Sequence, residues 1–427
     1  MSDFENNSKN RLAARTRKKR ARNLRLIRIF SVMLAICVAF VVGFLFRGNA
    51  HFLQSLGFPA SFTGLDDARA DTSSKDVYNS VSSRLAEVEN VLNDDSMDTY
   101  DLEAATNEVM TSLAQASADP YFRYFDTSRY SQLLADDAEG YAGVGVMFSE
   151  YNGQAYAVDV FEGSAAQLSD VRVGDFVVAV NGDRSQAWTR AEVIAALNNL
   201  QGESVVITWR RPESLESEGG SEYTTVLTCE PSTSRNITTE YLNGVGYIDI
   251  RQFTQNSSEL VQQAVEEFEE QGATSYVLDL RNNPGGYLNQ AVNVASLFIS
   301  SGNVVQIQTK NGVSVKAVSG TTATVRPVVV LVNQNTAASA EVLAAAFKET
   351  QRGTIIGQTT LGKGSVQVVR ELSFGGALRY TAAYYLTAQG RTIDKTGVNP
   401  DIAVYNGDSG DAQLDYAREY ASVLESE

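Results

Sequence analysis

The chain has 427 residues, 43% of them hydrophobic and 20% charged, so it is too long for one small domain and apolar enough to fold as two or three. It contains one histidine, His51, and two cysteines, Cys37 and Cys229, which leaves the His-rich and Cys-rich kinds of zinc site short of ligands. A catalytic triad that uses histidine would have to be built from His51, so other acid–base chemistry must use Lys, Asp, Glu or Tyr.

Charge is concentrated at the start of the chain. Residues 1–28 carry ten Lys or Arg side chains against Asp3 and Glu5, whereas the remainder holds 25 basic and 49 acidic residues. A basic tail beside an acidic body is typical of a membrane protein rather than of a nucleic-acid binder. We therefore expect no nucleic-acid partner.

An uncharged apolar run, Ile29–Phe46, follows the basic tail and is closed by Arg47. As a helix it would span roughly 27 Å, close to the hydrocarbon thickness of a bilayer. We expect a cytoplasmic tail over 1–28 and a transmembrane anchor over 29–47, with the rest of the chain outside the cytoplasm at the cell membrane. A cleaved signal peptide is the alternative, because small residues at Gly48-Asn49-Ala50 suit a cleavage site.

Residues 48–139 are predicted to be a linker followed by helices. Apolar residues recur at helical spacing between residues 74 and 135, and Asp98 or Thr99 is placed to cap the second helix. Nothing in this stretch suggests chemistry, so a packing or oligomerisation layer is expected.

Residues 140–230 have a different character, because short apolar strands alternate with glycine-rich turns. Strands are predicted at 144–148, 155–160, 176–180, 205–209 and 224–227, a helix at 190–200 and a loop at 212–222. The turns appear in the order Gly140-Tyr-Ala-Gly-Val-Gly-Val146, Gly163-Ser-Ala-Ala166, Val173-Gly-Asp175 and Val180-Asn-Gly182.

This order of turns resembles a PDZ domain, although the proline usual in the Gly-Ser-Pro-Ala turn is absent. In PDZ domains a glycine loop binds the C-terminal carboxylate of a peptide, and the peptide lies along a strand. The resemblance implies that Gly143, Val144, Gly145 and Val146 bind peptide. The plain alternative is that these glycines only make tight turns.

Residues 231–405 alternate strand and helix and predict an α/β core. Strands are expected at 245–250, 276–280 and 328–332, and helices at 258–271, 288–298 and 340–349. All-apolar strands between helices indicate a sheet that is covered on both faces. Residues 406–427 are predicted to contain a short terminal helix.

Three segments of this core could carry chemistry. A strand ends in Asp279 and Arg281 and turns through Pro284-Gly285-Gly286 into a helix, where exposed N–H groups could form an oxyanion hole. A second strand leads through a polar loop to Ala338, Ser339 and an alanine-rich helix, a place suited to a nucleophile. The third segment is Gly362-Lys363-Gly364-Ser365-Val366-Gln367, in which a desolvated lysine could accept a proton from a hydroxyl.

Together these segments resemble the carboxyl-terminal processing peptidases, also called tail-specific proteases. The resemblance runs from about residue 100 to residue 405 and includes Gly397-Val-Asn-Pro-Asp-Ile402. It implies a serine nucleophile with Lys363 as its base and Gln367 as the residue that orients the lysine.

The nucleophile position departs from this family. The family loop reads Ser-Ala-Ser-Ala-Ser-Glu, and alignment on Val330-Leu-Val-Asn and Glu341 puts Ala338 where the middle serine belongs. Ser339 is one residue late, which turns a side chain by about 100° in a helix. Three explanations are open: an engineered Ser→Ala variant, a natural pseudoprotease, or a loop that presents Ser339.

The sequence thus predicts an α/β multi-domain protein with one transmembrane helix, a helical region, a PDZ domain and a peptidase core. Its expected function is that of a membrane-anchored extracytoplasmic serine endopeptidase that acts on polypeptides with exposed C-termini. The alternatives are a catalytically dead peptide-binding protein or adaptor on the same scaffold, and a structural membrane protein with a PDZ domain. No metal or organic cofactor is implied, and a homo-oligomer is left open.

Overall fold

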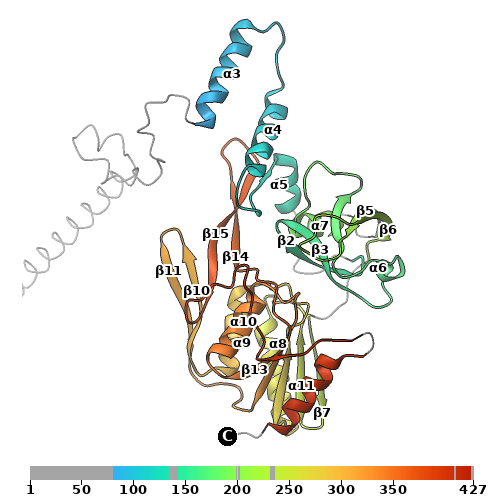
Figure 1. Ribbon diagram of the computed structural model, residues 1–427, viewed down its shortest axis with the longest axis vertical. Helices are drawn as coiled ribbons and strands as arrows, with labels where there is room; N and C mark the ends of the chain where they lie inside the picture. The colour runs from blue at the N-terminus through green and yellow to red at the C-terminus, as the bar shows by residue number, and fades with distance from the viewer. Residues whose placement is uncertain are drawn as a thin grey trace, which may run out of the picture. The chain divides into compact units, whose positions relative to one another are not determined.

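The computed structural model describes residues 80–134, 143–198, 200, 202–230, 236–407 and 410–424 (Figure 1). The chain divides into two compact units, residues 1–100 and 101–427. The expected tail and anchor, residues 1–28 and 29–47, lie outside the described residues. Within the described ranges, no helix has the length and apolar character needed to cross a membrane.

The first unit contributes one described helix, α3 (Val81–Asp95). Ser80 caps it, because its hydroxyl accepts a hydrogen bond from the amide of Ser83 at 3.2 Å. The helical spacing seen in the sequence is confirmed, but its apolar residues are exposed rather than buried.

The second unit begins with α4 (Leu102–Gln115), β1 (Arg123–Phe125) and α5 (Thr127–Leu134). The cap of α4 is Asp101, which accepts from the amide of Ala104 at 2.9 Å, and not Asp98 or Thr99 as expected. The strand β1 was not expected within this helical region. It forms because it pairs with a strand far along the chain, a partner that local spacing cannot reveal.

The middle domain, residues 143–230, is a five-stranded antiparallel sheet in the order β2-β3-β4-β5-β6. Its strands are β2 (Val146–Tyr151), β3 (Gln154–Val160), β4 (Phe176–Val180), β5 (Ser204–Arg211) and β6 (Ser221–Thr228), and its helices are α6 (Ala165–Leu168) and α7 (Arg190–Asn198). The rings of Phe148 and Trp209 stack in its core with centroids 6.1 Å apart. All five predicted strands and the longer helix are confirmed, although β6 begins inside the predicted loop.

The α/β core is built on a six-stranded sheet in the order β16-β13-β12-β9-β8-β7. Its strands are β7 (Ile237–Leu242), β8 (Val245–Ile250), β9 (Ser275–Asp279), β12 (Val328–Val332), β13 (Gly353–Gly357) and β16 (Ile402–Ala403). Only the β7–β8 pair is antiparallel. The predicted strands 245–250 and 328–332 are confirmed at both ends.

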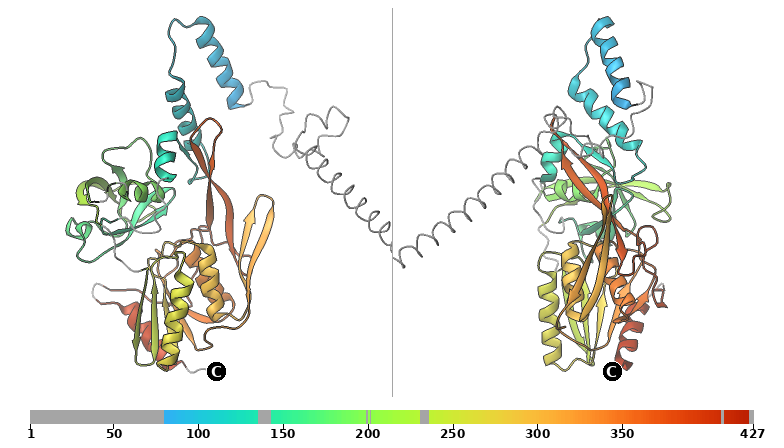
Figure 2. Two further views of the ribbon diagram at one scale, coloured as in Figure 1. Left: turned by 180° about the vertical axis from the view of Figure 1, so that it is seen from behind. Right: turned by 90° about the vertical axis from the view of Figure 1, so that its left-hand side faces the viewer.

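Helices cover both faces of this sheet, as the apolar strands predicted. One face packs against α8 (Ser257–Glu270), α9 (Leu288–Phe298) and α10 (Ser339–Glu349), and the other against α11 (Ala412–Val423). Figure 2 shows α8 and α11 on opposite sides of the strands. Residues of β9 and β12 are buried throughout, because each strand lies in the interior of the sheet with layers on both sides.

A third sheet contains long strands that the sequence did not predict: β10 (Ser301–Thr309), β11 (Gly312–Ser319), β14 (Ser365–Glu371) and β15 (Ala377–Thr387). Its order is β1-β15-β10-β11, with β14 paired to β15. This sheet positions the candidate site, because β14 starts two residues after Lys363 and β15 carries Arg379.

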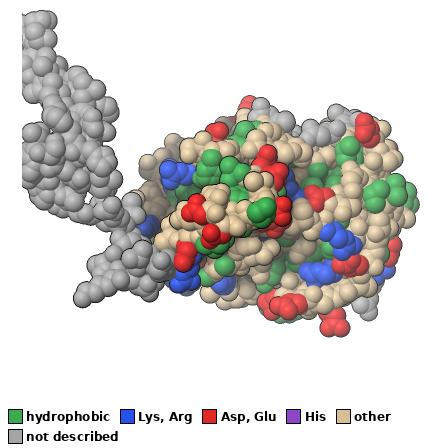
Figure 3. Space-filling view, turned by 90° about the horizontal axis from the view of Figure 1, so that it is seen from above, with side chains coloured by type: hydrophobic (Ala, Val, Ile, Leu, Met, Phe, Trp, Pro, Cys, Tyr) green, Lys and Arg blue, Asp and Glu red, His purple; other side chains and the backbone are tan. Residues whose placement is uncertain are grey.

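Acidic and basic side chains do not form separate patches on the face drawn in Figure 3. Acidic and basic side chains lie intermingled there with hydrophobic ones. A continuous basic surface of the kind that binds nucleic acid is not visible on that face.

Candidate functional site

Ala338 occupies a sharp turn between β12 and α10. Its backbone has φ 54° and ψ −120°, a left-handed conformation that a residue with a Cβ rarely adopts. Such a conformation costs about 1–3 kcal/mol and persists only where the surrounding structure imposes it. A strained strand-to-helix turn of this kind presents its side chain at the start of a helix, as a nucleophile requires. The alanine therefore stands where the sequence placed the nucleophile.

The turn Pro284-Gly285-Gly286 packs directly against this position. A Cβ on Gly285 would lie 2.8 Å from the Cβ of Ala338 and 3.2 Å from the amide nitrogen of Ser339. Gly285 also has φ +97°, so both its conformation and its close contact require glycine. The two predicted segments thus meet at one place.

The oxyanion donors differ from the expected pair. The amide of Gly285 donates to Oδ1 of Asn283 at 2.7 Å, so it is already engaged. The amide of Gly286 has no hydrogen-bond partner among the described residues. The second available donor is the amide of Ser339, which belongs to the first turn of α10 and has no acceptor within its own helix. Sequence reasoning named Ser339 for its hydroxyl and missed its amide.

The hydroxyl of Ser339 does not point at the lysine. Ser339 is 1% exposed, and its Oγ donates to the carbonyl oxygen of Gly286 at 3.3 Å. The structure therefore gives the hydroxyl of Ser339 a bond to the glycine turn, which the sequence did not predict.

Lys363 lies in the loop before β14. Its neighbour Gly364 is packed so closely that an added Cβ would lie 2.3 Å from the amide nitrogen of Asp394. Lys363 lines a cavity of about 900 Å³ together with Tyr121 and Leu215. Burial lowers the pKa of Lys363 to about 8, because the charged amine loses hydration among protein atoms. About a tenth of the amine is then neutral at pH 7, far more than for an exposed lysine, and this neutral form can accept a proton.

Glu341 joins the nucleophile turn to the lysine loop. Its Oε2 accepts from the amides of Ala338 at 2.9 Å and Lys363 at 2.8 Å. Its Oε1 accepts from the amide of Gly362 at 2.7 Å and from the hydroxyl of Thr360 at 2.5 Å. Glu341 is 0% exposed, and its burial raises its pKa to about 7 against the effect of these four donors. The sequence used Glu341 only to align the motif and missed this role.

The sequence predicted that Gln367 orients the lysine, but the structure gives Gln367 a different hydrogen-bond partner. Its Nε2 donates to Oγ of Ser365 at 2.9 Å. The group beside the amine of Lys363 is instead the ring of Tyr121, whose centroid lies 5.9 Å from Nζ. Tyr121 precedes β1 and carried no signal in the sequence, because only the tertiary fold brings it to the loop.

The predicted peptide-binding loop lies at the start of β2. The side chains of Val144 and Val146 are 1% and 0% exposed and belong to the core of the middle domain. A Cβ added at Gly143 would collide with the backbone carbonyl of Glu230, and one added at Gly145 would collide with the side chain of Ser164. Only the backbone of these four residues is therefore available for binding.

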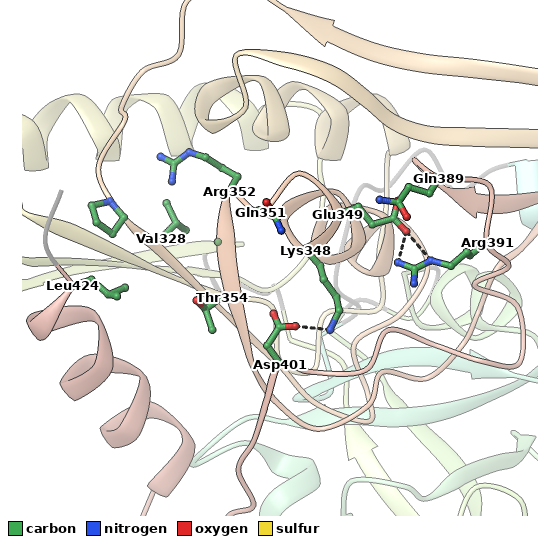
Figure 4. A pocket seen from close by; sticks show the side chains of 12 residues that line it. Val328, Lys348, Glu349, Gln351, Arg352, Thr354, Gln389, Arg391, Asp401 and Leu424 are labelled. Atoms are coloured by element: carbon green, nitrogen blue, oxygen red, sulfur yellow. Dashed lines mark hydrogen bonds and ion pairs between the residues drawn. The ribbon is translucent and has the colours of Figure 1, made fainter. Parts of the chain in front are cut away.

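A second cavity, of about 530 Å³, lies at the opposite ends of the core strands (Figure 4). Four of its five charged side chains form pairs, Lys348 with Asp401 at 2.6 Å and Glu349 with Arg391 at 2.7 Å. It is lined by Val328 and Thr354, near the starts of β12 and β13, whereas Ala338 follows the end of β12. This cavity is therefore separate from the candidate site.

Comparisons with known proteins show the family to which the chain is similar. Residues 244–404 match Peptidase family S41. The chain is 31% identical to the carboxy-terminal processing protease CtpA of Bacillus subtilis, over 68% of this chain and 62% of that protein. It is 32% identical to a carboxyl-terminal-processing protease of Synechocystis, over 67% of this chain and 68% of that protein. The solved photosystem II D1 C-terminal processing protease superposes with a TM-score of 0.62 at 28% identity, covering 79% and 90% of the two chains.

Proposed function

Because the chain belongs to peptidase family S41, and within it to the serine-type carboxyl-terminal processing proteases, we propose that it is a Ser/Lys endopeptidase scaffold whose nucleophile position holds alanine. Position 338 is the place of the nucleophile and Lys363 is the base. The observation that carries this proposal is the strained turn at Ala338 held to the lysine loop through Glu341. As it stands, the chain binds polypeptide without cleaving it, because a methyl group cannot attack a carbonyl.

With serine at position 338, the reaction would follow from this geometry. The neutral amine of Lys363 takes the hydroxyl proton while the oxygen attacks the scissile carbonyl carbon. Negative charge then develops on the carbonyl oxygen, where the amides of Gly286 and Ser339 can donate to it. When the intermediate collapses, the C–N bond breaks and the lysine returns the proton to the leaving amine. Water repeats the sequence on the acyl-enzyme and releases the acid.

The test compares the full-length chain with its Ala338→Ser variant in detergent micelles, with unfolded casein as substrate. Cleavage by the serine variant alone supports the proposal, and Lys363→Ala in that variant should abolish it. Cleavage by both chains, lost in Ser339→Ala, would assign the nucleophile to Ser339 instead. Cleavage by neither chain would favour a scaffold that only binds polypeptides.

For the middle domain we propose PDZ-type recognition of protein C-termini. Support comes from β2, which stands at the end of its sheet and so has one edge that can pair with a peptide. Fluorescence anisotropy would compare an apolar peptide that ends in a free carboxylate with the same peptide amidated. Tighter binding of the free carboxylate is expected, and equal binding would contradict this mode of recognition.

We also propose that residues 29–47 anchor the chain in the cell membrane with its folded body outside the cytoplasm. This rests on the apolar run and its basic flank. When the full chain is expressed in bacteria, it should sediment with the membrane fraction. Protease added to the cells should digest the folded body once the cell wall or outer membrane is permeabilised, while the inner membrane is still intact. Recovery of a chain lacking residues 1–47 from the soluble fraction would indicate a cleaved signal instead.

A further inference from the structure

A buried carboxylate of the middle domain pairs with an arginine of the third sheet. Glu150, on β2, is 2% exposed. Its Oε1 pairs with Nη2 of Arg379, on β15, at 2.7 Å. Its Oε2 accepts from the amide of Arg190, at the start of α7, at 3.2 Å. Glu150 thus joins two domains through an ion pair that water hardly reaches.

The ring of Tyr121 lies near both Lys363 and the Arg379 of this ion pair. Its centroid lies 5.9 Å from Nζ of Lys363 and 6.0 Å from the guanidinium carbon of Arg379. Lys363 and Arg379 therefore lie near the same aromatic ring, and Arg379 is also paired with the carboxylate of Glu150. Nη1 of Arg379 is buried without a hydrogen-bond partner among the described residues, so its charge depends on Glu150 for compensation.

We propose that Glu150 is a positioning residue of the Ser/Lys centre, the counter-charge through which the middle domain sets the protonation of Lys363. This inference rests on the proposed role of Lys363 as base. The middle domain would then supply a residue to the reaction centre, in addition to any role in binding the substrate.

The charges that face the lysine support this role. Burial has the largest effect on the pKa of Lys363 and lowers it, and the largest effect of a charge comes from Glu150, which raises it. Arg379 and Arg190 lower that pKa, and Glu341 raises it. Burial alone would raise the pKa of Glu150, but Arg379 and Lys363 outweigh burial and bring it to about 2, so the carboxylate is ionised. Its removal should therefore make the lysine lose its proton at a lower pH.

Lysine labelled with ¹³C at Cε allows this to be measured in the full chain without any need for catalysis. NMR titration would follow the Lys363 resonance, assigned by its loss in Lys363→Arg. Glu150→Gln should lower the titration midpoint by about one pH unit. In the Ala338→Ser background, the cleavage rate should rise with pH as the lysine loses its proton. Glu150→Gln should shift the midpoint of this rise to lower pH by a similar amount.

The matched control is Glu192→Gln. Glu192 is also a buried carboxylate of the middle domain, paired with Arg129 at 2.8 Å, but it is not among the charges that act on the lysine. It should reduce stability without moving the midpoint. Arg379→Gln should raise the titration midpoint of Lys363. If Glu150→Gln fails to fold, the result for Arg379→Gln tests the inference in its place.

Equal midpoints in Glu150→Gln and Glu192→Gln, or an unmoved midpoint in Arg379→Gln, would overturn the inference. If the midpoints move as expected but Ala338→Ser cleaves nothing, the electrostatic role of Glu150 stands and the proposed proteolysis fails.

Discussion

Ala338 and Lys363 donate their backbone amides to the same atom, Oε2 of Glu341, at 2.9 and 2.8 Å. The turn for the nucleophile and the loop of the base are therefore held together by main chain and one carboxylate, not by their own side chains. Exchanging the side chain at position 338 leaves all of these bonds in place. A serine introduced there should therefore keep the backbone contacts that join the two loops.

The first prediction concerns Glu341→Gln. All four partners of the carboxylate are donors, so an amide nitrogen in place of either oxygen would face donors and leave them unpaired. Each unsatisfied buried group costs about 1–3 kcal/mol, so the free energy of unfolding should fall by roughly 2–4 kcal/mol in a urea titration. Glu266→Gln, on the exposed face of α8, should change it by no more than about 0.5 kcal/mol. Equal effects of the two substitutions would show that Glu341 does not join the two loops.

The second prediction concerns Gly285→Ala in the Ala338→Ser background. The added Cβ meets the side chain at position 338 and the carbonyl oxygen of Ala337, at 2.8 and 3.1 Å, so the nucleophile turn must shift. A displacement of about 1 Å can cost about 10²-fold in rate, and we expect a loss of that size in kcat for casein cleavage.

Gly163→Ala is the matched control for this change. Gly163 also has a positive φ, +73°, but no atom lies within 4 Å of its added Cβ. It should cost stability through its backbone conformation and leave kcat unchanged. A comparable loss of kcat in both variants would mean that the contact with position 338 is not what limits the reaction.

The core of this fold could be predicted from sequence because its signals are local. The five consecutive apolar residues of β12, four of them valine, favour a strand buried on both faces, and the structure begins and ends it as expected. The strands β14 and β15 were missed because buried, half-buried and exposed residues mix along them, and their pairing is with each other and with β1.

The candidate site also contains some residues that the sequence marks locally and others that only the tertiary fold brings in. Lys363 and the turn at Ala338 could be found because glycines and a strand-to-helix change mark them in the sequence. Tyr121 and Glu150 carry no such mark, and they come from two other parts of the chain to lie beside Lys363 and Arg379. Hydrogen bonding also reassigned two expected roles, since Gly285 donates to Asn283 and Gln367 to Ser365.

The third prediction concerns Arg281→Met. The guanidinium of Arg281 pairs with Asp279, at the end of β9, and with Asp411, which caps α11, each at 2.6 Å. Asp279 is 3% exposed, so loss of its partner leaves a buried charge uncompensated. The free energy of unfolding should fall by about 3–5 kcal/mol in chemical denaturation. Arg172→Met breaks an exposed pair with Asp170 and should leave the free energy of unfolding nearly unchanged. Similar losses from the two changes would contradict a supporting role for the Arg281 bridge.

The fourth prediction concerns the pH dependence of stability in Lys363→Met. Burial lowers the pKa of Lys363 from 10.5 to about 8, so between these values the unfolded chain binds more protons than the folded one. Stability contributed by this group therefore rises with pH across that window, and the cost of burying the charged amine is fully present below about pH 8. At pH 7 the methionine variant, which carries no charge to bury, should be more stable than the parent by up to about 3 kcal/mol.

This advantage should shrink by about 2 kcal/mol between pH 7 and pH 9.5, because the parent then loses its costly proton. Urea denaturation of both chains at four pH values in that range measures the difference. Lys310→Met, at the exposed turn between β10 and β11, provides the matched comparison and should show a small difference that does not vary with pH. If Lys363→Met instead destabilises the chain by the same amount at every pH, the amine is solvated in the folded protein. Lys363 would then lack the dry surroundings that make it a base, and the Ser/Lys mechanism would lose its physical ground.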